Sequence, residues 1–199
     1  ISTQPYTGTY IVSLSETNQY TYEGDASYKL KKTTFQYDAY GNGKWMKEWG
    51  DASLTGDERE IFTEYAYNTT AWLISYPSHI YTLDSSGTKV QEKWFYYDNA
   101  TAYTTAPTKG LLTKEENWLF NPLTSGSSRL TYIYSYDNFG NRTKTTDPLG
   151  RVTATEYDLN LYTYPAKVTN ALGHITQNTY DQKTDQILTT TDPNNQITK

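Results

Sequence analysis

Hydrophobic and polar residues alternate along this chain over short stretches that are separated by turn-forming residues. The sequence VTATEY at 152–157, drawn as a strand, places two threonines and a tyrosine on one face and valine, alanine and glutamate on the other. Neither face is uniformly apolar, unlike a sheet packed on a globular core. Threonine, valine and tyrosine suit strands, and the intervening Pro- and Gly-containing turns disfavour helices. The pattern therefore predicts an all-β protein of short, predominantly antiparallel strands.

The last third of the chain repeats itself. Each unit opens with a Tyr-Asp pair: Tyr136-Asp137, Tyr157-Asp158 and Tyr180-Asp181. Each unit then reaches a second turn sequence: Asp147-Pro148-Leu149-Gly150, Asn170-Ala171-Leu172-Gly173 and Asp192-Pro193-Asn194-Asn195. The opening tyrosines lie 21 and 23 residues apart, and the second turns lie 23 and 22 residues apart. Two landmarks with one shared period indicate an internal repeat of strand pairs. We expect the opening tyrosines to occupy equivalent positions and to stack between adjacent units.

Related but looser signals occur earlier in the chain. The run YDAYGN at 37–42, which contains Tyr37, Asp38 and Gly41, parallels YDNFGN at 136–141, which contains Gly140. Tyr67-Asn68 and Tyr97-Asp98 follow at intervals of 30 residues and are interpreted as degenerate Tyr-Asp positions in longer hairpins.

The remaining elements follow from β-rich runs and turn residues. Strands are predicted at 6–14, 20–22, 61–67, 71–83, 88–97 and 114–120, with turns at Gly8, 23–25 and 84–87 and loops at 99–110 and 121–128. A short helix competes at 57–60, where we favour a polar loop. We expect longer, degenerate hairpins over 1–130 and regular repeats over 131–199, within one continuous segment.

The pattern YD…G…DPLGR…YD over 131–199 closely resembles the YD-repeat of the Rhs family, which also occurs in Tc insecticidal toxin components and, more distantly, in teneurins. The run KGLLTKEENWL at 109–119 is similar to the segment that precedes the regular repeats in Tc-like shell proteins. The resemblance implies a strip of β-hairpins wound in a spiral around a hollow that holds a cytotoxic polypeptide. It implies as partners the rest of the shell, in the same chain or a partner subunit, and the enclosed effector. The signature residues are Tyr37, Asp38, Gly41, Tyr97, Asp98, Tyr136, Asp137, Gly140, Asp147, Pro148, Gly150, Tyr157, Asp158, Gly173, Tyr180, Asp181, Asp192 and Pro193.

We therefore expect a structural segment of a secreted or cell-surface bacterial protein. The alternative is a cell-surface adhesion or carbohydrate-binding module, and a hydrolase is a third class. We also expect the chain to be a piece of a longer protein, because the next Tyr-Asp pair would fall just beyond Lys199.

Composition limits the classes of partner that the chain is expected to bind. The 199 residues carry a net charge of −5, which argues against nucleic acid as a partner. No apolar run approaches the roughly 20 residues of a membrane span, and no signal-peptide pattern heads the sequence. The 21 tyrosines supply much of the hydrophobic share and suit a thin, wet sheet, since tyrosine can bury its ring and keep its hydroxyl hydrogen-bonded.

Residues for catalysis or metal binding are scarce. The chain has no cysteine and two histidines, which makes a catalytic triad or a typical zinc site improbable. His174 takes the slot of Arg151 and Gln196 in sister units, and His79 has no acidic partner at a recognisable spacing. The repeated aspartates are interpreted as turn caps, with calcium ligation as the weaker alternative. We predict no enzymatic site, no metal and no cofactor.

Two further motifs allow a second interpretation. Rhs-family proteins carry an Asp-Pro-x-Gly-Leu element at which self-cleavage releases the effector, but Arg151 stands where that leucine is expected, so we interpret residues 147–150 as a turn. The five tryptophans could stack on sugars, and we favour packing between neighbouring hairpins.

Overall fold

The computed structural model describes residues 2–6, 9–22, 24, 27–121 and 126–199. Within them the backbone forms strands and turns and contains no helix. The strands are β1 (Ser2–Tyr6), β2 (Thr9–Val12), β3 (Glu16–Tyr22), β4 (Tyr28–Tyr37), β5 (Gly43–Asp51), β6 (Arg59–Asn68), β7 (Leu73–Asp84), β8 (Lys89–Tyr97), β9 (Leu112–Asn121), β10 (Gly126–Tyr136), β11 (Arg142–Thr146), β12 (Val152–Tyr157), β13 (Pro165–Thr169), β14 (Ile175–Asp181), β15 (Gln186–Thr191) and β16 (Ile197–Thr198).

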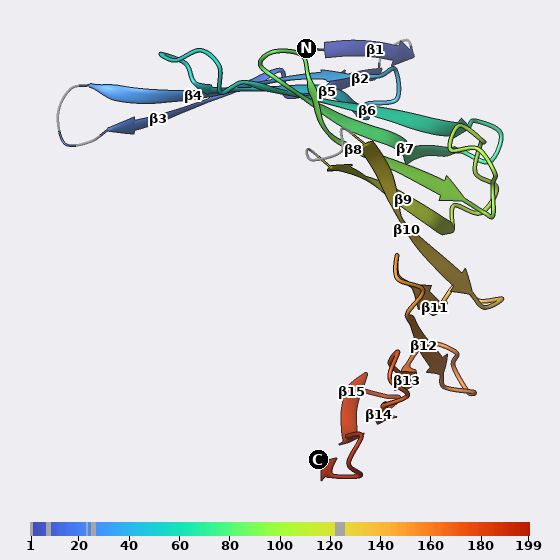
Figure 1. The fold of residues 1–199 in the computed structure, drawn as a ribbon. Coiled ribbons are helices and arrows are strands. Elements are labelled where there is room, and N and C mark those ends of the chain that lie inside the picture. The colour runs from blue at the N-terminus through green and yellow to red at the C-terminus, as the bar shows by residue number, and fades with distance from the viewer. Residues whose placement is uncertain (1, 7–8, 23, 25–26, 122–125) are drawn as a thin grey trace.

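Strands β3 to β16 form one open antiparallel sheet in which every strand pairs with its neighbours in sequence. Strands β1 and β2 form a separate two-stranded hairpin. Figure 1 shows β3 to β8 lying across the top of the view, from where the sheet descends through β9 and β10 to the short strands near the C-terminus. The expected all-β, antiparallel fold is confirmed.

Strand length changes along this sheet. Strands β4 to β10 have 9 to 12 residues, whereas β11 to β16 have 2 to 7. The short strands match the close spacing of turn sequences after residue 136, which leaves about five residues between one turn and the next.

The sheet is a single layer. Its chain of 22.8 kDa exposes 13311 Å² of surface, whereas a compact monomer of that mass exposes about 9,600 Å². The buried hydrophobic side chains among the described residues are Trp94, Tyr96 and Tyr97 on β8 and Ala66 on β6. Stability therefore comes mainly from strand pairing and from contacts between side chains on the same face, rather than from a second layer.

Several boundaries differ from those predicted. The loop expected at 121–128 is shorter, because β9 continues through Asn121 and β10 begins at Gly126. Polar residues such as Ser127 and Ser128 pair with the hydrophobic end of β9, so strand pairing overrides their turn preference. Of the polar loop favoured at 57–60, the residues at 57 and 58 form a loop, whereas Arg59 and Glu60 already belong to β6. The turn predicted at Gly8 and most of that at 23–25 lie outside the described residues.

Candidate functional site: the Tyr-Asp turns and the polar face

Six turns share one hydrogen-bond pattern that begins with Asp or Asn. The side-chain Oδ1 of the first residue accepts the backbone N–H groups of the residues two and four positions later, at 2.8 to 3.0 Å. The fourth residue has a positive φ, which favours glycine and tolerates asparagine. The first residues are Asp38, Asp84, Asp137, Asp147, Asn170 and Asp192, and the fourth are Gly41, Gly87, Gly140, Gly150, Gly173 and Asn195.

The Asp147-Pro148 element is one of these turns. Asp147 Oδ1 accepts the N–H groups of Leu149 and Arg151, and Arg151 Nε donates to Asp147 Oδ2 over 2.6 Å. Proline in the second position, here and at Pro193, fixes φ where no N–H is needed. Asn170 builds the same geometry without proline. The Asp147-Pro148 element is therefore one example of the second turn that recurs in each repeat unit.

Three Tyr-Asp positions have longer connections. Asp98 accepts the N–H groups of residues 108 to 111, at 2.7 to 3.0 Å, and so closes the β8–β9 loop. Asp158 accepts four backbone N–H groups, and these bonds lower the pKa of its carboxyl to about 2. Asp181 Oδ1 accepts the Lys183 N–H in a turn where Asp185 has the positive φ. The aspartate thus organises backbone N–H groups in turns of different length.

The tyrosine before each of four aspartates makes an equivalent contact. Its hydroxyl donates to a backbone carbonyl of the preceding strand: Tyr97 to Pro77 (2.8 Å), Tyr136 to Leu112 (2.7 Å), Tyr157 to Arg142 (3.3 Å) and Tyr180 to Pro165 (3.2 Å). The expected stacking between repeat tyrosines is wrong for the described residues, because each ring lies along its own hairpin to reach that carbonyl. Tyr37 ends β4, directly before the Asp38 turn.

The turns alternate between two edges of the sheet because every strand pairs with the next one. We call the side of the sheet at which the strand ends carry the Tyr-Asp turns the YD edge. Its turns follow even-numbered strands, and several of them lie on the right of Figure 1. They are the turns at 38–42, 68–72, 98–111, 137–141, 158–164 and 181–185. The other edge carries the turns at 52–58, 84–88, 147–151, 170–174 and 192–196 and is called the second edge.

Side chains connect successive turns along the YD edge. Asn42 Nδ2 donates to the Ile74 carbonyl over 2.8 Å, and Asn141 Nδ2 donates to the Tyr162 carbonyl over 2.5 Å. Asn68 Nδ2 donates to the Pro107 carbonyl over 2.8 Å. The Tyr164 hydroxyl reaches Asp185 in the last of these turns. Each contact joins one hairpin to the following one, so the asparagine of the YD…GN motif fixes how neighbouring hairpins sit.

One face of the central strands carries a buried polar cluster. The strand register places Glu64, His79, Trp94 and Glu116 in one row across β6 to β9. His79 Nδ1 lies 3.1 Å from Glu64 and Nε2 lies 2.8 Å from Glu92, and its ring stacks on Trp94 at 5.6 Å. The sequence-based expectation that His79 lacks an acidic partner is therefore wrong.

The same cluster is extended by cations and hydroxyls. Glu116 accepts the Tyr96 hydroxyl at 2.8 Å and Arg129 Nη1 at 2.6 Å, and the Arg129 guanidinium lies 3.9 Å above the Trp94 ring. Burial raises the pKa of the Tyr96 hydroxyl to about 12, with the Glu116 carboxylate adding to the shift. Burial opposes ionisation of Glu92 and Glu116, yet their hydrogen bonds outweigh it and lower both pKa values. The cluster is thus a network of paired charges that binds strands together without an apolar second layer.

The β8–β9 loop covers part of this cluster. Tyr103 contacts the His79 ring at 5.4 Å and the Tyr96 ring at 6.4 Å, and Pro107 is fully buried. The sequence predicted a loop at 99–110 but not that it docks on the cluster, which depends on the Asp98 contacts described above.

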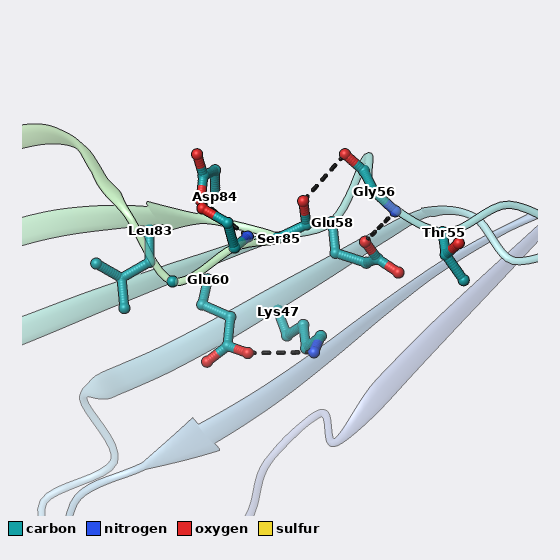
Figure 2. Close-up of a pocket in the computed structure, with 10 residues that line it drawn as sticks. Lys47, Thr55, Gly56, Glu58, Glu60, Leu83, Asp84 and Ser85 are labelled. Carbon is teal, nitrogen blue, oxygen red and sulfur yellow. Dashed lines mark hydrogen bonds and ion pairs between the residues drawn. The ribbon is translucent and has the colours of Figure 1, made fainter.

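A polar pocket of about 610 Å³ lies at the second edge, between the β5–β6 loop and the β7–β8 turn. Figure 2 shows Lys47 and Glu60 at its floor, joined by an ion pair of 3.1 Å. Ser85 Oγ donates to the Gly56 carbonyl and the Gly56 N–H donates to Glu58. Its polar groups bond one another, including the Ser86 hydroxyl, which donates to Asp84 Oδ1 over 2.6 Å, so the pocket joins two loops.

The remaining candidates are peripheral. His174 occupies the fifth position of its turn, where its N–H donates to Asn170. In the described part of the chain, no group of three or more His, Cys, Asp or Glu side chains is placed to hold a metal ion. No helix long and apolar enough to cross a membrane occurs among those residues.

Comparison with known proteins agrees with this geometry. Residues 123–152 match the family model described as RHS Repeat, which confirms the resemblance to Rhs and YD-repeat proteins in that segment. No curated protein sequence matches the chain. The fold is similar to the crystal structure of TcdB2-TccC3-Cdc42, with a TM-score of 0.68 and 13% identity over 93% of this chain and 13% of that one.

Two further structures are similar to the same extent. The crystal structure of TcdB2-TccC3 gives a TM-score of 0.67 at 14% identity, over 93% of this chain and 14% of that one. TcdB2-TccC3 without its hypervariable C-terminal region gives a TM-score of 0.67 and 14% identity, over 93% of this chain and 13% of that one. The chain spans about one seventh of the solved chains it matches, and this likeness establishes a shared fold.

Proposed function

We propose that this chain is a section of wall in a YD-repeat β-shell that encloses an effector polypeptide before its delivery. The single observation that carries the proposal is the open, one-layer sheet whose YD edge is joined turn to turn by side chains. A wall needs continuity and stiffness, and it needs no chemistry of its own.

The polar face of strands β6 to β9 supports this role. A sheet that packs on a globular core has one apolar face, whereas here the face of β6 to β9 carries paired charges and aromatic rings. Such a face is stable without an apolar second layer, so it can line a hollow that holds a polypeptide. The match to Rhs repeats and the likeness to a part of TcdB2-TccC3 support the same role.

The proposal includes the chain's context. The rest of the shell, in the same chain or a partner subunit, continues the sheet beyond β3 and β16, the two strands at its ends. Residues 1–130 supply longer hairpins and residues 131–199 supply the regular repeats of one strip. The protein is a secreted or cell-surface bacterial protein without an enzymatic site in this section.

Protease protection tests enclosure. The longer protein that contains this chain is purified with its effector polypeptide and treated with a nonspecific protease. We expect the effector to survive in the wild type and in Asn138→Ala, an exposed position in the same turn as Asn141. The double variant Asn42→Ala/Asn141→Ala removes the contacts to Ile74 and Tyr162, so it should allow faster digestion.

Enclosure is contradicted if the effector is digested at the same rate in the wild type and in both variants, and if that rate equals the rate for the isolated effector. If such a protein also binds cells or glycans saturably, the adhesion alternative replaces the proposal.

A further inference from the structure

Three aromatic rings gather at the YD edge between the turns after β4 and β6, and a fourth, Tyr65, stacks on one side of Tyr67 at 6.2 Å. Tyr40 lies 5.3 Å from Tyr67 and 6.2 Å from Trp72, measured between ring centroids. The Trp72 and Tyr40 rings are nearly perpendicular, at 85°. The three side chains are 39%, 37% and 62% exposed, so the rings contact each other and still present open surface.

The backbone at Trp72 is unusual. Its φ of 56° lies in the left-handed region, where the four-residue Tyr-Asp turns at 38–41 and 137–140 use glycine. A bulky side chain is unfavourable in this conformation. Burial of the indole does not compensate, since most of it is exposed. Strained residues of this kind concentrate at functional positions.

A carboxylate without a cationic partner lies beside the rings. Asp38 Oδ2 accepts the Tyr67 hydroxyl at 2.6 Å, and its other contacts are N–H groups of Tyr40 and Asn42. Partial burial opposes its ionisation, but the hydrogen bonds from Tyr67 and Asn42 lower its pKa. None of the ion pairs among the described residues includes Asp38, whereas Glu60, Glu92 and Glu116 each pair with lysine or arginine.

The corresponding place between the turns after β10 and β12 is closed. Phe139 takes the position of Tyr40 in its turn, and the left-handed aromatic residue of the next turn is Tyr162, with a φ of 54°. These two rings stack face to face at 4.2 Å and 16°. The Tyr162 ring is therefore covered by a ring of the chain itself, whereas Trp72 meets Tyr40 edge to face at 85° and stays 62% exposed.

We propose that Tyr40, Tyr67 and Trp72 form a binding site for a small quaternary-ammonium cation of the choline type. Aromatic faces attract such cations through their quadrupoles, and groups of several rings are the usual way proteins hold them. The unpaired Asp38 carboxylate adds negative potential, and methylated nitrogen needs no hydrogen-bond acceptor. This inference does not depend on enclosure of an effector.

Choline itself is the probe, and 3,3-dimethyl-1-butanol is its uncharged counterpart of the same shape. Titration of the full chain is followed by NMR shifts of the Trp72 indole N–H and by calorimetry. We expect saturable choline binding with a dissociation constant of about 1–10 mM, and binding of the neutral alcohol at least about tenfold weaker.

Trp72→Gly tests the site with little risk to folding, because glycine adopts the positive φ without strain. We expect it to weaken choline binding at least about tenfold and to leave the thermal midpoint unchanged or higher. Tyr162→Gly is the matched control: it removes the other left-handed aromatic and should leave choline affinity unchanged.

Three results would overturn the proposal. Choline could fail to saturate the protein, the neutral alcohol could bind equally well, or Trp72→Gly could bind choline as the wild type does. Tyr40→Leu provides a second variant if the glycine variant proves misfolded, and unchanged choline affinity in it would also count against the site.

Discussion

Asp98 should control whether the β8–β9 loop docks on the polar cluster. Its carboxylate accepts four consecutive backbone N–H groups, from Thr108 to Leu111, and the Thr108 hydroxyl at 3.3 Å. Asp98→Ala removes all of these acceptors at once. The loop then loses the contacts that hold Tyr103 against His79 and keep Pro107 buried.

The magnitude follows from the number and exposure of these bonds. Hydrogen bonds to a charged group contribute roughly 1.5–3 kcal/mol each when buried. Asp98 is only half-buried, so water screens these bonds, and bonds to one acceptor are not additive. We therefore expect Asp98→Ala to cost about 2–4 kcal/mol in total. The cost of Asp98→Asn should be smaller than that of Asp98→Ala but greater than zero. One carboxylate oxygen is replaced by an amide nitrogen, which is a donor and faces N–H groups that it cannot accept.

Hydrogen exchange is the appropriate assay because a sheet of repeats can open locally before it unfolds globally. At about 1.4 kcal/mol per tenfold, the loss predicts that exchange of the amides at 109–111 accelerates about 30- to 700-fold. Asn99→Gly is the control: residue 99 has a φ of 62°, which glycine adopts readily, and its backbone N–H to Thr113 is retained. It should change exchange by less than about threefold.

The effect should also depend on pH. Burial opposes ionisation of Asp98, but the bonds from Lys109, Gly110, Leu111 and Thr108 outweigh it and lower its pKa. A carboxyl with a lowered pKa in the folded state stabilises above its unfolded pKa of about 3.9 and loses that contribution as pH falls through the folded value. The difference between wild type and Asp98→Ala should therefore begin to shrink below about pH 4 and disappear below the folded pKa of Asp98. Equal amide protection in both proteins at pH 7 would refute the reasoning.

Three other substitutions, with Gly43→Ala as a control, test the roles of these contacts by urea unfolding. Tyr136→Phe removes the hydroxyl bond to the Leu112 carbonyl and should cost about 1 kcal/mol, and an unchanged midpoint would contradict the role assigned to the repeat tyrosines. Gly150→Ala, at a φ of 77°, should cost about 1–2 kcal/mol. Gly43→Ala, which has open space and no positive φ, should be near neutral, so equal effects at the two glycines would be inconsistent with a backbone cause. Glu116→Gln weakens bonds to a tyrosine hydroxyl and two cations and should cost about 1–3 kcal/mol at pH 7. Because its pKa is lowered in the folded state, this difference should shrink below about pH 4.

The turns could be predicted because their chemistry is local. Asp137 and Gly140 determine their own loop: the carboxylate accepts N–H groups two and four residues away, and glycine supplies the positive φ. The repeat period then fixes the order of strands, since each short run pairs with the next. For the same reason an all-β meander follows from the sequence pattern.

Contacts between side chains on different strands were harder to predict from the sequence. His79 meets Glu64 and Glu92 through a register that bulges beside Glu64, and a shift of one residue would place them on opposite faces. The tyrosine contacts were assigned to the wrong partner because a ring in a strand can reach a neighbouring ring or a neighbouring backbone carbonyl. Trp72 could not be recognised at all, since its strain appears only in the backbone angle.

Electron cryo-microscopy of the longer protein that contains this chain tests the central claim most directly. The account predicts that residues 28–199 form one uninterrupted layer in the wall of a closed shell, with the Asn42 and Asn141 contacts intact and density for a polypeptide inside. A sheet folded back into a two-layer sandwich with a dry apolar interior, or an extended strip with solvent on both faces and no enclosed polypeptide, would contradict it.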